Sequence, residues 1–273
     1  MSNLDAGLIQ RSLAEASLAR LDQLEVFGSI ASTNTHLLTQ PAPSPGRFRV
    51  AMADHQTSGR GRHSRRWLSP PGAGLCLSLA YTFAESPEDL PALTLAIGVG
   101  IVDALRALEI EGVSLKWPND VVALEGKLGG VLTEVQSSNS EGVTIVTGIG
   151  LNVDLQQQPD FGAKSDWAQR AIDLRSVRPD HPQREHIAAA LVGSLHVVMA
   201  TFEAQGFAAF IADWQQNDWL RGREITVDLE DRQVTGIAAG VDTDGALLVE
   251  SGSGKTRIIS GSIVLAGVSE KLQ

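Results

Sequence analysis

With 273 residues, the chain is long enough for one sizeable domain and a smaller second one. Its hydrophobic content of 43% predicts an ordinary folded protein, and its net charge of -10 argues against a sequence-independent nucleic-acid binder, which would carry a basic surface. The single cysteine, Cys76, rules out a disulfide framework within the chain and is compatible with a reducing cytoplasm.

The N-terminal region shows no signal-peptide pattern, because no basic stretch precedes an apolar run. The most apolar stretch, 90–108, is interrupted by Asp103 and Arg106. This stretch therefore predicts a buried helix in place of a membrane span. We expect a soluble cytoplasmic protein that does not bind a membrane.

Helices are expected where apolar residues recur at helical spacing or where capping residues precede them. Leucines at roughly helical intervals predict a short amphipathic helix within 4–22. The Ser-Thr-Asn sequence at 32–34 offers N-cap side chains, so a helix should begin there. Longer helical regions are predicted at about 89–109 and 184–217.

Strands are expected in two groups, of which the second has turn signals between short strands. In that group Asp244-Gly245 predicts a hairpin turn, and the pattern after Gly222 indicates a separate small β-barrel. The first group is expected at about 48–54, 74–83, 112–117, 119–124, 128–136 and 143–153. The second group is expected at about 224–229, 233–239, 246–250, 257–260 and 263–265.

The segment 58–66 has the most unusual composition, with four arginines and two glycines in nine residues. A solvated basic loop is the plain interpretation of such a segment. The surrounding protein is acidic, however, and the planar guanidinium group suits phosphate recognition. The sequence therefore favours a mobile loop, here called the arginine loop, that folds over an anionic intermediate.

A second basic feature lies in Lys116-Trp117-Pro118-Asn119-Asp120, followed by Lys127-Leu128-Gly129-Gly130. Charges at the ends of buried strands are costly unless they meet opposite charge. Two lysines beside glycines, which let backbone N–H groups approach closely, predict a bound phosphate or carboxylate.

Each part of this second feature also has a purely structural interpretation. Lys127 could protect a strand edge from aggregation, although the adjoining Gly-Gly pair favours a ligand. Asn119 and Asp120 could form a simple turn. The glycines in Gly148-Ile149-Gly150-Leu151-Asn152 are equally compatible with a strand bulge and with close approach of a ligand.

Other motifs fail. Ser253-Gly254-Lys255-Thr256 ends like a phosphate-binding P-loop, but Val249 occupies the position of the first glycine. The histidines lack metal-ligand spacing, so no metal site is expected.

Five short segments, in this order and spacing, resemble the biotin protein ligase family. They are Ser32-Thr33-Asn34, Gly59-Arg60-Gly61-Arg62, Lys116-Trp117-Pro118-Asn119-Asp120, Lys127-Leu128-Gly129-Gly130 and Gly148-Ile149-Gly150-Leu151-Asn152.

The resemblance implies an α+β fold in three parts. They are an N-terminal helical extension (1–25), a catalytic domain related to class II aminoacyl-tRNA synthetases (26–220) and an SH3-like β-barrel (221–273). Some family members carry an N-terminal DNA-binding domain, for which about 25 residues are too few. The chain thus resembles the monofunctional type.

The resemblance also implies a two-step reaction with biotin and ATP as substrates and Mg²⁺ accompanying ATP. The biotin carboxylate attacks the α-phosphate, and a lysine of a biotin carboxyl carrier protein, from acetyl-CoA carboxylase or a similar carboxylase, then takes up the biotinyl group. No nucleic acid is expected as a partner. Family members often form dimers through the catalytic sheet, so a homodimer is allowed.

Site roles follow from the resemblance. Lys127 would be the main electrostatic catalyst and Arg62 a closing group, while Asp120 would either polarise the incoming lysine or bind Mg²⁺. Biotin would contact Ser32, Thr33, Asn34, Gln56, Arg60, Gly61, Arg62, Lys127, Gly129 and Gly130. ATP and the adenylate would contact Arg62, Trp67, Lys116, Asn119, Lys127 and Asn152.

One departure concerns the end of the arginine loop, where the family commonly has Arg-Gly-Arg and this chain has His63-Ser64-Arg65. Loss of that glycine would stiffen the loop. Three alternatives remain: a lipoate ligase or octanoyl transferase, a non-enzymatic biotin-sensing regulator, and an inactive binding protein. The Gly-Arg-Gly-Arg sequence and Lys127 favour the biotin ligase.

Overall fold

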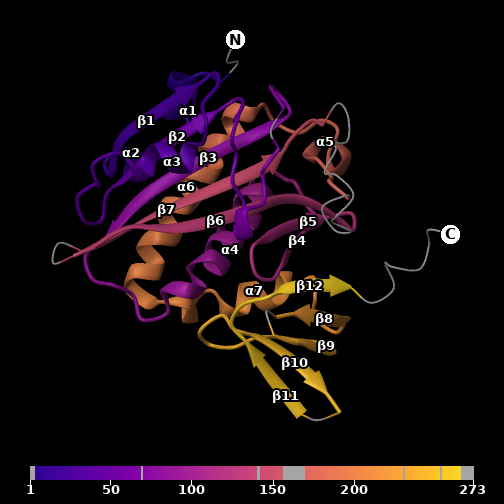
Figure 1. The fold of residues 1–273 in the computed structure, drawn as a ribbon. Helices are drawn as coiled ribbons and strands as arrows, with labels where there is room; N and C mark the ends of the chain where they lie inside the picture. The colour runs from indigo at the N-terminus through magenta and orange to yellow at the C-terminus, as the bar shows by residue number, and fades with distance from the viewer. Residues whose placement is uncertain are drawn as a thin grey trace.

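Two β-sheets organise the chain, a seven-stranded mixed sheet and a five-stranded antiparallel sheet (Figure 1). The structure is a computed structural model that describes residues 4–68, 70–139, 142–155, 170–229, 231–252 and 254–265. The large sheet has the strand order β1-β2-β3-β7-β6-β5-β4, in which β1 and β2 pair in parallel and the other described pairs are antiparallel. Its strands are β1 (Leu21–Phe27), β2 (Phe48–Ala53), β3 (Gly74–Phe83), β4 (Val113–Lys116), β5 (Asp120–Ala123), β6 (Gly126–Asn139) and β7 (Gly142–Asn152).

Helices α4 (Leu93–Ala107) and α6 (Arg184–Gln205) contact each other and cover one face of this sheet (Figure 1). Alternate residues of β3, from Leu75 to Phe83, point into the same apolar core. Both helical regions, 90–107 and 184–205, are long and apolar enough to cross a membrane, but their burial is that of core helices in a folded domain. The remaining helical segments are α1 (Ala6–Arg11), α2 (Glu15–Leu18), α3 (Thr33–Leu38), η1 (Arg62–Ser64), η2 (Leu90–Ala92), α5 (Leu174–Val177), η3 (Phe207–Ala209) and α7 (Ile211–Asn217).

Among the residues that the structure describes, α3 covers part of the opposite face of the large sheet. Leu37 of this helix packs on Ala51, Ala80 and Val146, which lie on three neighbouring strands. Next to this small cluster the strands carry small or polar residues, such as Ser78 on β3. This face is therefore the one that can accept a ligand.

The small sheet has the order β11-β10-β9-β8-β12 and contacts the large domain through its β9–β10 turn. The predicted turn at Asp244-Gly245 is present, with Gly245 at a φ of +83°. Trp117 donates a hydrogen bond of 3.0 Å from Nε1 to the carbonyl oxygen of Gly245. The strands are β8 (Glu224–Asp228), β9 (Gln233–Val241), β10 (Leu247–Ser251), β11 (Gly254–Ile258) and β12 (Ser262–Leu265).

Most predicted elements of the large sheet are present within a few residues, and the short helix expected within 4–22 is present as α1, but the second helix α2 and the start of β1 were not predicted. Two short helices, α1 and α2, occupy this region, and β1 begins at Leu21. The reason is long-range: β1 pairs with β2, and the ion pair between Asp22 and Arg47 joins them at 2.5 Å. Leucine spacing alone carries no information about that pairing. In the small sheet, the strand expected at 257–260 forms earlier, as β11.

Candidate active site

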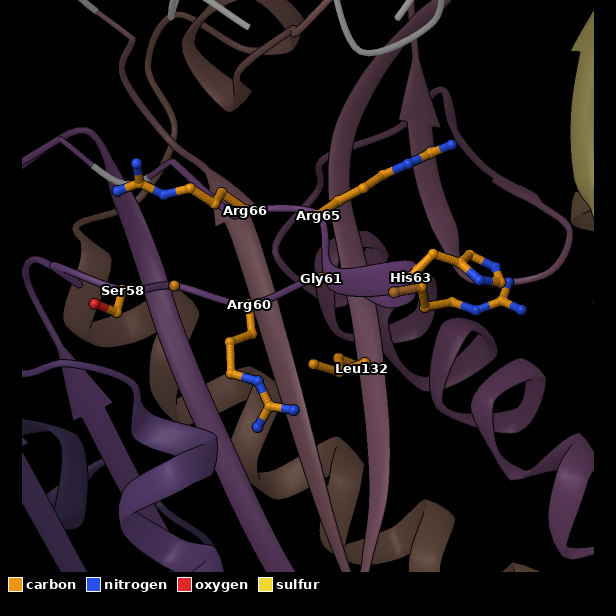
Figure 2. Close-up of a pocket in the computed structure, with 9 residues that line it drawn as sticks. Ser58, Arg60, Gly61, His63, Arg65, Arg66 and Leu132 are labelled. Carbon is orange, nitrogen blue, oxygen red and sulfur yellow. The ribbon is translucent and has the colours of Figure 1, made fainter.

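A cavity of about 640 Å³ opens on the partly covered face, between the arginine loop and β6 (Figure 2). In Figure 2, the side chains of Arg65 and Arg66 extend from the loop in opposite directions. The side chain of Arg60 lies next to that of Leu132 in this view. The cavity is lined by Ser58, Gly59, Arg60, Gly61, Arg62, His63, Arg65, Arg66 and Leu132.

Beside the loop, Asp120 holds two lysines. Its Oδ1 lies 2.5 Å from Lys127 Nζ and its Oδ2 lies 3.5 Å from Lys116 Nζ. Burial would raise the pKa of Asp120, but the two ammonium groups outweigh burial and hold that pKa below its ordinary value. Burial also lowers the pKa of Lys116, against the opposing effect of Asp120. One carboxylate and two cations give this cluster a net positive charge.

The short strands around this cluster explain how the sequence builds it. Lys116 and Asp120 face each other across the β4–β5 pair, and Asp120 lies opposite Gly130 of β6. Asn119 fixes the turn, because its Nδ2 donates to the carbonyl of Val131 at 2.8 Å and its own carbonyl accepts from Val131 N at 2.9 Å.

Asn152 supports the same cluster from β7. Its Nδ2 donates to the carbonyl oxygens of Lys127 at 3.3 Å and of Ile172 at 3.0 Å. The backbone of Lys127 is therefore held by a side-chain amide, and the amide groups of Asn119 and Asn152 both bind protein carbonyls. These two residues, expected to hold ATP, are engaged in building the site.

The N-terminus of α3 forms the other end of the site. Ser32 is the N-cap, and its hydroxyl accepts from Thr35 N at 3.3 Å. The side-chain oxygen of Gln56 accepts from both the N–H and the hydroxyl of Thr33, at 2.8 and 3.1 Å. Ser78 donates to Thr33 Oγ1 at 2.7 Å or to the side-chain oxygen of Asn34 at 2.6 Å.

Two glycines of β7 create space for side chains of the site. A Cβ atom on Gly148 would overlap the side chain of Asn34, and one on Gly150 would overlap the ring of Trp67. The indole of Trp67 thus rests on bare backbone, with Lys127 Nζ 5.9 Å from a ring centroid. The glycines therefore serve close packing of predicted site residues, and the strand pairing shows no bulge at these positions.

The Gly129-Gly130 pair is less uniform than expected. A Cβ atom on Gly129 would lie 2.7 Å from the carbonyl oxygen of Gly150, so a neighbouring strand explains this glycine. A Cβ atom on Gly130 would lie 3.4 Å from the end of the Lys127 side chain. Only Gly130 therefore lies directly beside the catalytic candidate.

The arginine loop folds back on itself. Gly61 N donates to the Arg65 carbonyl at 2.8 Å, and Trp67 N donates to the Gly59 carbonyl at 3.0 Å. His63 adopts a left-handed conformation with a φ of 52°, in the part of the loop that departs from the family pattern. Burial lowers the pKa of Arg62, which lies within electrostatic range of Asp120 and Arg65.

The structure brings the predicted residues together on one face and adds two that the sequence analysis missed. Ser78 bonds the start of α3, and Glu134 of β6 pairs with Arg60 at 2.7 Å. The available signal for Ser78 was a polar residue within the largely apolar strand β3, whereas Glu134 lies among other polar residues of β6. Within the described residues, no group of three His, Cys, Asp or Glu side chains could hold a metal ion.

Comparisons with known proteins agree with this geometry. The model of the biotin/lipoate A/B protein ligase family matches residues 26–152, and that of the biotin protein ligase C-terminal domain matches 221–266. A biotin–[acetyl-CoA-carboxylase] ligase of Mycobacterium tuberculosis is 33% identical over 250 residues, covering 89% of this chain and 88% of the relative. The bifunctional ligase/repressor BirA of Salmonella typhimurium is 32% identical over 250 residues, covering 90% of this chain and 73% of the relative.

The fold is similar to a solved structure of biotin protein ligase from Aquifex aeolicus in complex with biotin and ATP. The TM-score is 0.70 at 28% identity, with 90% of this chain and 98% of the other covered. The two family models match most of the large sheet and the small sheet, respectively, and neither matches residues 153–220.

Proposed function

This chain belongs to the biotin protein ligase family, and we propose that it activates biotin with ATP and transfers it to a lysine of a biotin carboxyl carrier protein. The observation that carries the proposal is the Lys116–Asp120–Lys127 cluster beside the arginine loop. Such a group of cations suits a reaction in which a carboxylate must approach a phosphate.

In the first step, an oxygen of the biotin carboxylate attacks the α-phosphorus of ATP, and the bond to the pyrophosphate leaving group breaks. Lys127 offsets the repulsion between the two anions and stabilises the charge that develops at phosphorus. In the second step, the amine of the carrier lysine attacks the biotinyl carbonyl and AMP leaves. The arginine loop excludes water, which would otherwise hydrolyse the mixed anhydride.

Asp120 serves in this scheme to hold Lys127. Its carboxylate has a lowered pKa and is shared by two lysines, so it is a weak base and is engaged by cations of the protein. This favours a positioning role over the two roles that the resemblance left open, polarising the incoming lysine or binding Mg²⁺. Mg²⁺ would enter with ATP, held largely by phosphate oxygens, and supply further neutralisation of charge.

Biotin and the adenylate occupy different ends of the site in this proposal. The ureido end of biotin binds to Ser32, Thr33 and Gln56. The nucleotide binds to Trp67, whose indole rests on Gly150. The hydrogen bonds around α3 and the bare strand under the indole support these two assignments. The remaining biotin contacts proposed are Asn34, Arg60, Gly61, Arg62, Lys127, Gly129 and Gly130. The remaining nucleotide contacts proposed are Arg62, Lys116, Asn119, Lys127 and Asn152.

Family membership also supports finer proposals about fold and setting. We propose that the large domain is related to class II aminoacyl-tRNA synthetases, and that the small sheet is an SH3-like barrel. The net charge of -10 supports action in the cytoplasm without nucleic-acid or membrane binding. A homodimer through the large sheet is a further proposal.

The match of residues 221–266 to a biotin protein ligase C-terminal domain favours biotin over lipoate as the substrate. The test is incubation of the purified chain with labelled biotin, magnesium-ATP and a carrier domain. We expect label on one carrier lysine. Transfer of a lipoyl or octanoyl group in its place would indicate the acyl transferase, and biotin binding without transfer would indicate a sensor.

A further inference from the structure

Glu134 of β6 joins the arginine loop to the start of α3. Its Oε1 lies 2.7 Å from Arg60 Nη2 and its Oε2 lies 3.3 Å from Arg60 Nη1. Oε2 also accepts a hydrogen bond of 3.0 Å from Asn34 Nδ2, at the start of α3. The carboxylate and the guanidinium form a two-pronged pair, the geometry in which arginine recognises a carboxylate most specifically.

Charge is unevenly distributed along the site. Near Gly130 of β6, two lysines share the single carboxylate of Asp120, and further arginines of the loop lie nearby. Glu134 lies four residues further along the same strand, a distance of about 13 Å for extended backbone. There, one carboxylate meets one guanidinium, that of Arg60, and the pair has no net charge.

We propose that Glu134 is a positioning residue that sets the orientation of biotin, an inference that rests on the proposed function. Biotin has an uncharged ureido ring at one end and a carboxylate at the other. By cancelling the charge of Arg60 close to Thr33 and Gln56, Glu134 removes the cation that would attract the biotin carboxylate to the wrong end. The carboxylate is thereby directed to Lys127.

The test compares three variants by titration calorimetry with biotin alone and by steady-state kinetics. Glu134→Gln keeps the size of the side chain and an acceptor for Asn34 but removes the charge. We expect its Kd and KM for biotin to rise about tenfold, with a smaller change in kcat. Glu134→Asp leaves the proposed biotin contact Arg60 in place and keeps a negative charge beside it, so its biotin affinity should stay within about threefold of the unaltered protein.

Glu25→Gln is the matched control. Glu25 pairs with His36 of α3 at 2.9 Å and has a side-chain exposure of 28%, close to the 21% of Glu134, but its partner is not Arg60, which lines the cavity. Its removal tests whether any loss of a carboxylate next to α3 weakens biotin binding. We expect no change in Kd for biotin.

Two results would overturn the inference. One is an unchanged biotin affinity in Glu134→Gln. The other is a Glu134→Asp variant that binds biotin as weakly as Glu134→Gln, because the charge of Glu134 would then not be what matters. Failure of the unaltered protein to bind biotin would be a different outcome, since it would remove the proposed function itself. Calorimetry needs no turnover and therefore tells these failures apart.

Discussion

Lys127 Nζ lies 2.5 Å from Asp120 Oδ1, so the proposed electrostatic catalyst is held by a buried carboxylate. The same carboxylate also binds Lys116, which fixes the ammonium group of Lys127 without cancelling the positive charge of the cluster. Preorganised charge of this kind stabilises a transition state without reorganisation during the reaction. Positions and charges in this cluster lead to the first prediction.

Asp120→Asn should lower stability by about 3 to 5 kcal/mol, because it leaves two adjacent cations without their shared carboxylate. A carboxyl group with a lowered folded-state pKa contributes stability above its unfolded pKa and loses it as pH falls through the folded value. The ordinary value for Asp120 is 3.8. Urea unfolding should therefore show a difference between the two proteins that is constant above about pH 5 and shrinks below the ordinary value. A difference that is independent of pH across this range would contradict the lowered pKa.

Gly150→Ala and Gly148→Ala should each raise the KM for a different substrate. The first places a Cβ atom in the ring of Trp67 and the second places one in the side chain of Asn34. We expect KM for ATP to rise between about ten- and a hundredfold in the first variant, and KM for biotin to rise similarly in the second.

Gly193→Ala, in α6, is the control for these glycine variants, because nothing lies within 4 Å of the added Cβ atom. It should leave both KM values unchanged and stabilise the helix slightly. If Gly150→Ala and Gly148→Ala raised both KM values equally, the assignment of separate ends to biotin and ATP would be wrong.

Arg62→Ala should leave folding nearly unchanged and release biotinyl-AMP at least about tenfold faster, since the loop loses a closing contact. Arg62 is half-buried, and its guanidinium lies within electrostatic range of Asp120. Filter-binding of the labelled adenylate measures the release rate. An unaltered rate would remove Arg62 from the proposed lid.

Gly245→Ala should weaken the junction between the two sheets. The glycine has a φ of +83°, and an added Cβ atom would lie 2.8 Å from Ala92 Cβ. We expect a loss of at least about 1 kcal/mol, measured by thermal unfolding and by protease cleavage between the domains. Gly252→Ala, in the β10–β11 turn, meets nothing within 4 Å and should be neutral. Equal effects of the two substitutions would argue against a specific junction at the β9–β10 turn.

The sequence predicted the large sheet well where the signal was local. The strands at 74–83 and 143–153 are mostly apolar in sequence, and α3 begins at the predicted Ser32 cap. The prediction missed the strand that begins at Leu21, because β1 forms by pairing with β2 and has little hydrophobic alternation of its own. Strand pairing between distant segments is a tertiary property that periodicity does not report.

For the site, the sequence identified the residue types but not all of their tasks. Asn119 and Asn152 remain proposed nucleotide contacts, and the fold adds a second task, because the Nδ2 group of each donates to protein carbonyls. Glu134 and Ser78 were missed, because neither belongs to one of the five motifs and the partners of each come from another element. Sequence motifs thus identified most of the side chains of the site. Only the fold showed which of these side chains bind one another.

The central claim is that Lys127 stabilises the charge of the adenylation step. The most direct measurement is biotin-dependent pyrophosphate release by Lys127→Ala, with Lys255→Ala as the control, because Lys255 is a surface lysine paired with Glu250 in the small sheet. We predict a fall of about 10² to 10³-fold for Lys127→Ala and no change for the control. Near-normal pyrophosphate release by folded Lys127→Ala would contradict the account.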